Sequence, residues 1–410
     1  MTHSGHVANE SPTEAYDGPP DYRQVGRHAM FPQTSHDEMA RLNFLAQMNR
    51  HLATRVMPHV RAAWERRVLP GLIRRDGKPP ASRHGVREAL LQDRAFQIWS
   101  SLRRLTMEQR QEAGRWTAIR QAEALAAQAR ALTLGAEDRL SLDPHLAIPR
   151  YVTAVDHHCM PGSYHSELFP GDVSNAASYD HAIFATTGGL LGRFSDGGGQ
   201  AVVAWLQRQH ADFRPRRILE IGATLGHSLL PIAKAFPDAD IVAVDLGAPM
   251  LRYGLARARA LGVDNVRFIQ ADGSDLSMFP DQSFDWVQTT MFLHELSSPA
   301  LKEIFAESYR LLAPGGLVLH VEQPQYDDDM PLFEQAMRDW DAFYNNEPFW
   351  SRLHEIDLGG MLCEAGFRPD QIIHGAVTAV VDKSVFPDAA DQGHEDFGRK
   401  AAWQVIGARK

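Results

Sequence analysis

The stretch Leu219-Glu220-Ile221-Gly222-Ala223-Thr224-Leu225-Gly226 joins an apolar segment to a segment of helical character that begins near His227. Gly222 permits a tight turn and a close approach of a ligand to the backbone, and Gly226 permits close packing of a helix on a strand. A two-glycine loop is weak evidence by itself, because many α/β proteins use one simply as a turn. The stretch therefore predicts a strand–loop–helix unit whose loop can hold a nucleotide.

The chain after this loop alternates between short apolar segments and helical segments, which is typical of a parallel sheet covered by helices. The expected strands are Arg217–Ile221, Asp240–Asp245, Val266–Ala271, Phe284–Thr290, Gly316–Glu322, about Ile372–Asp382 and Trp403–Ala408. Residues 201–410 are therefore predicted to form a seven-stranded α/β sheet.

Two carboxylates follow the loop at the ends of successive predicted strands. Asp245 ends the second strand, where it can accept hydrogen bonds from a ribose diol, and Asp272 follows the third strand, where it can accept one from an exocyclic amine. A dinucleotide-binding loop would need glycines at the positions of Thr224 and His227. The sequence therefore excludes the dinucleotide dehydrogenase pattern while keeping a nucleoside-binding site.

Two later motifs complete a recognisable order, Phe284-Asp285-Trp286-Val287 and Leu312-Ala313-Pro314-Gly315-Gly316. The order resembles the class I S-adenosylmethionine (SAM) dependent methyltransferases over residues 215–325, and more loosely over 350–410. The resemblance implies a Rossmann-like seven-stranded methyltransferase sheet with SAM as the cofactor. It implies that the cofactor is bound by Glu220, Gly222, Thr224, Gly226, Asp245, Leu246, Met250, Asp272, Gly273 and Thr290.

The same resemblance assigns these residues to parts of the cofactor. Glu220, Gly222 and Thr224 would line the methionine and ribose region, and Asp245 would hold the ribose diol. Leu246 and Met250 would pack near the adenine, and Asp272 and Gly273 would read its edge. Thr224 stands where the family often has glycine.

His294 follows the fourth predicted strand, and Glu322 ends the fifth. An imidazole suits general-base work on a hydroxyl, and a carboxylate beside it can orient the ring. The pair resembles the L-H-D motif and strand-end glutamate of plant-type small-molecule O-methyltransferases, although Leu296 replaces the usual aromatic residue. A purely structural His294, fixing the loop by hydrogen bonds, is the alternative.

We expect a SAM-dependent methyltransferase that methylates oxygen on a small-molecule or natural-product acceptor, with His294 as general base and Glu322 as its partner. Methylation of a carboxyl group, including a peptide C-terminus, would need no base. Methylation of carbon or nitrogen, and a SAM-binding protein that transfers no methyl group, also remain open.

A polar cluster precedes the sheet at Asp156–His165. It suggests substrate contacts by His157, His158, Tyr164 and His165, from a lid over the cofactor, or else a structural loop. We expect no metal site, because no pair in it has the His-x₃-His spacing of a helical metal site.

The aromatic-rich stretch 327–350 follows the fifth strand. Its Trp340 and Tyr344 are candidates for the wall of a substrate pocket, which would suit a hydrophobic acceptor. Helices that pack on the N-terminal part of the chain are the alternative interpretation.

The N-terminal half is predicted to contain three parts. Residues 1–35 read as a flexible tail, 36–143 as a helical domain for substrate binding or homodimerisation, and 144–200 as a connector and lid. Leu91, Ala95, Ile98, Leu102 and Leu105 form one helical stripe, and breaks are expected at Pro70-Gly71, at residues 77–80 and near Gly114.

Composition excludes several classes. Residues 41–140 hold 19 Lys and Arg against 9 Asp and Glu, although the net charge of the 410 residues is −9. These basic residues can lie on solvated helix faces, attract an acidic partner or dock on an acidic neighbour. Neither a nucleic-acid motif, nor a membrane span, nor a secretory signal is visible. Two distant cysteines suggest a reducing, cytoplasmic setting.

Overall fold

A computed structural model describes residues 21–189, 191–378 and 402–410. Its centre is an eight-stranded sheet in the order β1-β4-β3-β2-β5-β6-β8-β7. β1 to β6 are parallel to one another, and β8 runs antiparallel between β6 and β7. The strands are β1 (Leu140–Ser141), β2 (Arg217–Ile221), β3 (Asp240–Asp245), β4 (Val266–Gln270), β5 (Phe284–Thr290), β6 (Leu312–Glu322), β7 (Ile372–Thr378) and β8 (Ala402–Arg409).

The Rossmann-like α/β fold is confirmed, and all seven expected strands are present. The eighth strand, β1, was not predicted, because two residues are too few to show strand alternation. The end of the sixth expected strand, after residue 378, lies outside the described residues.

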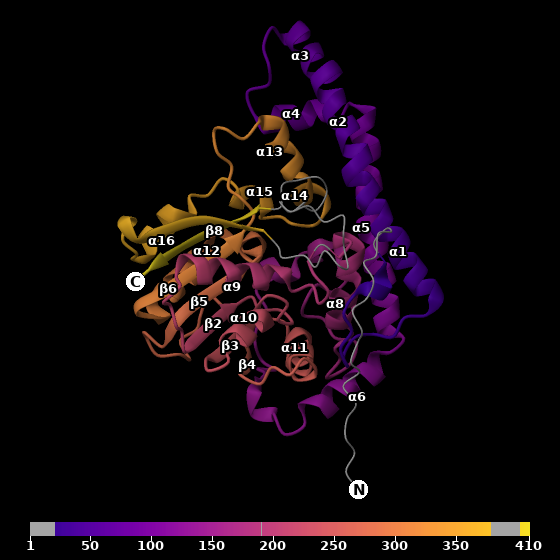
Figure 1. Ribbon diagram of the computed structural model, residues 1–410. Helices are drawn as coiled ribbons and strands as arrows, with labels where there is room; N and C mark the ends of the chain where they lie inside the picture. The colour runs from indigo at the N-terminus through magenta and orange to yellow at the C-terminus, as the bar shows by residue number, and fades with distance from the viewer. Residues whose placement is uncertain (1–20, 190, 379–401) are drawn as a thin grey trace.

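Helices cover both faces of the sheet, as Figure 1 shows. Side chains of α9 (Gly197–Gln209), α10 (Leu229–Ala235) and α11 (Ala248–Ala260) form one apolar core with the strands. Those of α12 (Ser298–Leu311) and α16 (Leu358–Ala365) form a second core on the opposite face. The strands are buried on both sides, which explains their nearly continuous apolar runs.

A helical layer runs along the side of the sheet (Figure 1). It contains α1 (His36–His51), α2 (Met57–Ala63), α3 (Leu69–Asp76), α4 (Arg83–Leu90), α5 (Arg94–Ile119), α6 (Ala122–Thr133) and, from the connector, α7 (Arg150–Thr153) and α8 (Ser174–Thr187). The layer extends from α6 below the sheet to α3 and α4 above it (Figure 1). The insertion after β6 adds α13 (Leu332–Arg338), α14 (Trp340–Tyr344) and α15 (Trp350–Leu353). None of the helices in the described ranges is both long and apolar enough to cross a membrane.

Two of the expected helix breaks are absent. Helical structure runs from α1 to α3 through Pro70, because π-helical turns at Leu52–Val56 and Trp64–Val68 loosen the backbone before α3. α5 continues through Gly114, where a Cβ atom would lie 2.5 Å from the Cβ of Ala182. This glycine is therefore explained by the close crossing of α5 and α8.

The predicted tail is shorter than residues 1–35. From Asp21 onward the chain packs on the helical layer, with Tyr22 and Met30 fully buried. The hydroxyl of Tyr22 lies 3.1 Å from Nδ1 of the buried His181. A few large apolar side chains are therefore enough to hold this segment, which its overall composition did not indicate. Residues 1–20 lie outside the described part of the chain.

Arginines of the basic helical layer pair with acidic residues elsewhere in the chain. Arg83 lies 2.6 Å from Asp339, and Arg103 lies 3.1 Å from Asp341, with all four residues buried. Arg61 reaches Glu334 at 3.0 Å. The basic helices therefore dock on the acidic insertion after β6, which is one of the three readings that the charge asymmetry left open.

Candidate active site

The loop after β2 has a backbone that only small residues adopt easily. Gly222 and Gly226 have φ angles of 74° and 84°, and Thr224 also lies in the left-handed region at 46°. A Cβ atom at Gly222 would be 2.3 Å from the ring of Phe292. The loop therefore needs a glycine at 222 both for its backbone and for the space above it.

Asp245, at the end of β3, fixes this loop. Its Oδ2 accepts a hydrogen bond from the Thr224 amide at 2.8 Å, and its Oδ1 accepts one from the Gly247 amide at 2.8 Å. Burial raises the pKa of this carboxyl to about 6, against the lowering effect of the two amides. Asp245 thus holds the left-handed Thr224 in place, a role that the sequence did not suggest.

Glu220, near the end of β2, is buried beneath the loop. Burial raises its pKa to about 8, with a hydrogen bond from Thr290 acting in the opposite direction. Within the described chain its Oε2 atom has no hydrogen-bond partner. A buried acceptor without a partner is costly, so this atom is suited to a ligand that brings a donor or a positive charge.

The predicted adenine-side residues lie along the same edge of the sheet. Asp272 accepts hydrogen bonds from the amide and hydroxyl of Ser274 at 2.9 and 2.7 Å. A Cβ atom at Gly273 would be 2.4 Å from Ile221. Met250 is fully buried in α11, whereas Leu246 is half-buried. The ten predicted cofactor residues therefore all lie at the carboxyl ends of β2–β5 or in the segments that follow them.

His294 and Glu322 meet because β5 and β6 are parallel neighbours whose carboxyl ends lie at one edge. Nδ1 of His294 lies 2.8 Å from Oε1 of Glu322, and the His294 amide donates to Oε2 at 3.3 Å. Both residues are buried. Burial lowers the pKa of His294, but the charge and hydrogen bond of Glu322 outweigh it, and the pKa rises to about 9.

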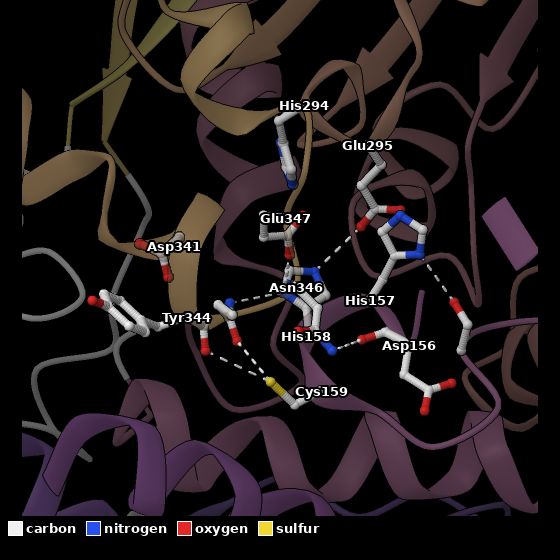
Figure 2. Close-up of polar contacts among 12 residues, drawn as sticks. Asp156, His157, His158, Cys159, His294, Glu295, Asp341, Tyr344, Asn346 and Glu347 are labelled. Carbon is white, nitrogen blue, oxygen red and sulfur yellow. Dashed lines mark hydrogen bonds and ion pairs between the residues drawn. The ribbon is translucent and has the colours of Figure 1, made fainter. Parts of the chain in front are cut away.

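The connector brings its polar cluster beside His294 (Figure 2). His158 lies 3.2 Å from Glu295 and 2.5 Å from Glu347, and the Tyr164 hydroxyl donates to Glu295 at 2.9 Å. The carbonyl oxygen of Tyr164 lies so close to Gly247 that a Cβ there would be 2.6 Å away. The segment around residues 156–165 therefore covers the edge of the sheet between Asp245 and His294.

The other residues of this segment have different surroundings. His157 is buried, with Nδ1 3.3 Å from the Ser163 hydroxyl. His165 is half-buried, and burial lowers its pKa. These contacts place His157 in a structural hydrogen bond of the loop.

Electrostatic coupling in the cluster is strong. Burial lowers the pKa of His158, but the charges of Glu347 and Glu295 raise it to about 10. Burial raises the pKa of Glu295, but its bond to His158 and the charge of that imidazole lower it to about 2. His158 is therefore protonated and Glu295 ionised at neutral pH.

The aromatic insertion divides into two parts. Trp340 is buried in the helical layer, where its Nε1 donates to the Ser100 hydroxyl at 2.7 Å and its ring lies 5.8 Å from that of Trp99. The hydroxyl of Tyr344 accepts a hydrogen bond from Arg87 at 3.3 Å. Trp340 and Tyr344 therefore pack on the helical layer, as the second interpretation of this stretch expects, and their place in the wall of a substrate pocket stays a prediction.

Two residues that sequence reasoning did not select do reach the site. The ring of Trp350 lies edge-on to His294, with centroids 4.7 Å apart, and Glu347 is fully buried beside His158. The aromatic density of the insertion was a signal for Trp350. Glu347 stands between Asn346 and Pro348, in a sequence that is typical of an exposed turn. The sequence therefore held no signal that Glu347 belongs to the site.

The comparisons with known proteins agree with this geometry. A family model described as "Methyltransferase domain" matches residues 218–316. A ubiquinone/menaquinone biosynthesis C-methyltransferase from Pseudomonas savastanoi pv. phaseolicola is 31% identical over 182 residues, which cover 40% of this chain and 69% of that protein. The chain belongs to the class I SAM-dependent methyltransferases.

Two further relatives match shorter parts of this methyltransferase. A demethylmenaquinone methyltransferase from Thermus thermophilus is 34% identical over 27% of this chain and 48% of that protein. A fatty-acid O-methyltransferase from Mycolicibacterium smegmatis is 32% identical over 32% of this chain and 44% of that protein. The chain thus spans about half the length of these two relatives.

The cofactor of the methyltransferase is SAM, and the residues present fit it. The unpartnered Oε2 of Glu220 suits a cationic ligand, and the left-handed Gly222 presents loop backbone without a side chain, as the close approach of a ligand requires. When bound, SAM supplies an electrophilic methyl group on a sulfonium. Asp245 and Glu220 are the residues of this chain that would hold it.

Proposed function

We propose that this methyltransferase transfers a methyl group from SAM to a hydroxyl oxygen of a small-molecule acceptor, with His294 as the general base. The observation that carries the proposal is the His294–Glu322 pair, 2.8 Å apart and buried at the carboxyl edge of the sheet. The hydrogen bond to Glu322 occupies Nδ1, so Nε2 is the atom that accepts a proton from the acceptor. Glu322 then stabilises the imidazolium that forms.

The surroundings of the pair support this role. A neighbouring positive charge lowers the pKa of an imidazole, so binding of the cationic cofactor favours the neutral form that a base needs. Trp350 covers one side of the His294 ring, and the connector covers another through His158. The chemistry is then positioning and exclusion of water, followed by removal of one proton by His294.

Methylation of carbon on a phenolic ring is the second candidate. It is favoured by the two relatives whose printed names are quinone-biosynthesis methyltransferases. Removal of a phenolic proton makes the neighbouring ring carbon nucleophilic, so the same His294 would serve both reactions. A general base therefore indicates an acceptor with a hydroxyl group, and it is compatible with methylation of either the oxygen or the carbon.

Carboxyl methylation has less support. The argument for it is that a basic helical layer could attract a carboxylate. However, Arg83 and Arg103 of this layer are already paired with aspartates of the insertion. A carboxylate acceptor also needs no base, which would leave the His294–Glu322 pair without a role.

Product analysis tests the proposal. The full-length protein is incubated with SAM carrying a ¹³C-labelled methyl group and with sets of phenols, aliphatic alcohols and carboxylic acids. We expect S-adenosylhomocysteine to be released and the label to appear at the chemical shift of an O-methyl group. A label found only on carbon or nitrogen would contradict O-methylation, and acceptor-dependent chemistry without S-adenosylhomocysteine would contradict methyl transfer altogether.

We also propose homodimerisation through the helical layer. Part of the apolar stripe of α5 faces solvent, because Ile98 and Leu105 are 56% and 52% exposed. Two apolar side chains seven residues apart on one helix suit a helix of a second copy. We expect light scattering to give a dimer that an Ile98→Glu, Leu105→Glu double variant converts to monomer; a wild-type monomer would contradict this.

A further inference from the structure

The acceptor side of the site brings together four side chains that bind metals in other proteins. One ligand atom from each of His158, His294, Glu295 and Glu347 lies within 4.8 Å of the other three. They come from the connector, from the loop after β5 and from the insertion after β6, and Figure 2 shows them gathered around one point. The cluster is therefore created by the tertiary fold and by no sequence motif.

Glu347 gives an independent sign that this cluster binds a ligand. Its side chain is fully buried, and its Oε1 forms an ion pair with Nδ1 of His158 at 2.5 Å. Its Oε2 accepts no hydrogen bond from any described residue. A buried carboxylate is costly unless it is paired, hydrogen-bonded or bound to a metal.

The backbone holds His158 toward these carboxylates at some cost. His158 and Cys159 both have left-handed φ angles, 53° and 57°, which are unfavourable for residues with a side chain. Hydrogen bonds from the insertion fix the turn: Asn346 donates to the Asp156 carbonyl at 2.9 Å, and the Asn345 amide lies 3.3 Å from Nδ1 of His158. The insertion thus positions both Glu347 and the imidazole that faces it.

We propose that His158, Glu295 and Glu347 bind one divalent transition-metal ion beside His294. One neutral imidazole and two carboxylates carry a charge of −2, which a dication neutralises, and this mixed nitrogen and oxygen set suits Mn²⁺, Fe²⁺ or Zn²⁺ better than Mg²⁺. Ligands about 2.1 Å from an ion lie roughly 3–4 Å apart, so side-chain shifts of about 1 Å bring these three residues to bonding distance and leave His294 free as the base.

The site deepens the proposed function and rests on it for its chemical role. The ion would lie between the connector and His294, where an acceptor hydroxyl could bind it while facing the base. A metal-bound hydroxyl loses its proton more easily than a free one. Metal and base would then act on one oxygen atom, which selects acceptors that present a hydroxyl with a second donor atom for chelation.

Metal binding is measured without SAM or acceptor, so its outcome is separate from that of methyl transfer. The full-length protein is stripped with a chelator and titrated with MnCl₂, and free Mn²⁺ is followed by electron paramagnetic resonance. We expect one Mn²⁺ per chain, displaced by ZnCl₂. Glu347→Gln should weaken binding at least about 100-fold, whereas Glu334→Gln, a matched change in the same insertion at an exposed ion pair, should leave it unchanged.

Circular dichroism and SAM affinity show whether each variant is folded. If Glu347→Gln does not fold, Glu295→Gln and His158→Ala provide the same comparison, since each removes one ligand. Absence of Mn²⁺ and Zn²⁺ binding up to about 1 mM would overturn the proposal. Equal binding by the wild type and a folded ligand variant would also overturn it, because the ion would then be held elsewhere on the chain.

Discussion

The two halves of the site differ in how the chain builds them. The cofactor half lies within residues 220–290, on consecutive strands and the loops that follow them. Its key contact, from the Thr224 amide to Asp245, joins residues 21 positions apart. In the acceptor half, Tyr164 meets Glu295 across 131 positions, and Asn345 meets His158 across 187.

This difference separates what local sequence specifies from what tertiary packing specifies. A strand, its loop and the next strand-end carboxylate have fixed relative positions in a parallel sheet, so spacing alone predicts their meeting. The acceptor half depends on how the connector and insertion dock on the helical layer, through buried pairs such as Arg103–Asp341. The cofactor half should therefore tolerate changes in the insertion, and the acceptor half should not.

The largest expected effect breaks the docking of the insertion. Trp340→Ala should lower the free energy of unfolding by about 3–5 kcal/mol, because it empties a buried site between Trp99 and Ser100. Phe343→Ala, at an exposed ring in the same helix, should cost less than about 1 kcal/mol. Denaturant unfolding measures both; equal, small losses would contradict the structural role of Trp340.

The next effect is confined to the cofactor half. Asp245→Ala should weaken SAM binding at least about 100-fold, because two loop amides lose their charged acceptor and the ribose seat is lost. Asp272→Ala should weaken SAM binding about tenfold or less, since among the described residues the hydrogen bonds to this carboxylate come from Ser274 in the same turn. Calorimetry with SAM gives both values, and intact binding by Asp245→Ala would refute this placement of the cofactor.

A smaller effect is the pH dependence of SAM affinity. Burial raises the pKa of Asp245 to about 6 and that of Glu220 to about 8, so both lose protons between pH 5 and 9. A cationic ligand favours the ionised carboxylates. Affinity should therefore rise with pH through this range, about tenfold from Glu220, and level off above pH 8.

Glu220→Gln separates this carboxylate from titration of SAM itself. The variant should lose the part of the rise centred near pH 8 and keep the part near pH 6. Identical profiles for the variant and the wild type would show that Glu220 does not meet the positive charge of the ligand.

The smallest expected effect comes from Thr224→Gly. Glycine relieves the left-handed strain at φ 46°, about 1 kcal/mol, and adds a similar entropy to the unfolded chain. Stability should change by less than about 1 kcal/mol and SAM affinity by less than about threefold. A large loss of affinity would mean that the Thr224 side chain contacts the cofactor directly.

The fold was predictable because its strands have a clear sequence pattern. Apolar runs of five to seven residues followed by Gly222 or Asp245 gave strand ends that the structure reproduces. β1 was too short to detect, and the ordering of residues 21–35 depends on tertiary burial of Tyr22 and Met30. His294 and Glu322 were predictable from strand order alone.

Glu347 and the role of His158 were not predictable. Glu347 lies in a turn whose sequence looks solvated, and its burial results from the docking of the insertion on the connector. Trp340 was one of two candidates in its aromatic stretch for the wall of a pocket, and the structure places it in the core of the helical layer.

The central claim is that cofactor binding and acceptor activation are separable, and His294→Ala tests it most directly. SAM affinity and the single-turnover rate of methyl transfer are measured at saturating SAM on the acceptor identified by product analysis. The account predicts SAM affinity within about twofold of the wild type and a rate lower by about 10²–10⁴. An unchanged rate, or a loss of SAM affinity that accounts for the whole loss of rate, would contradict it.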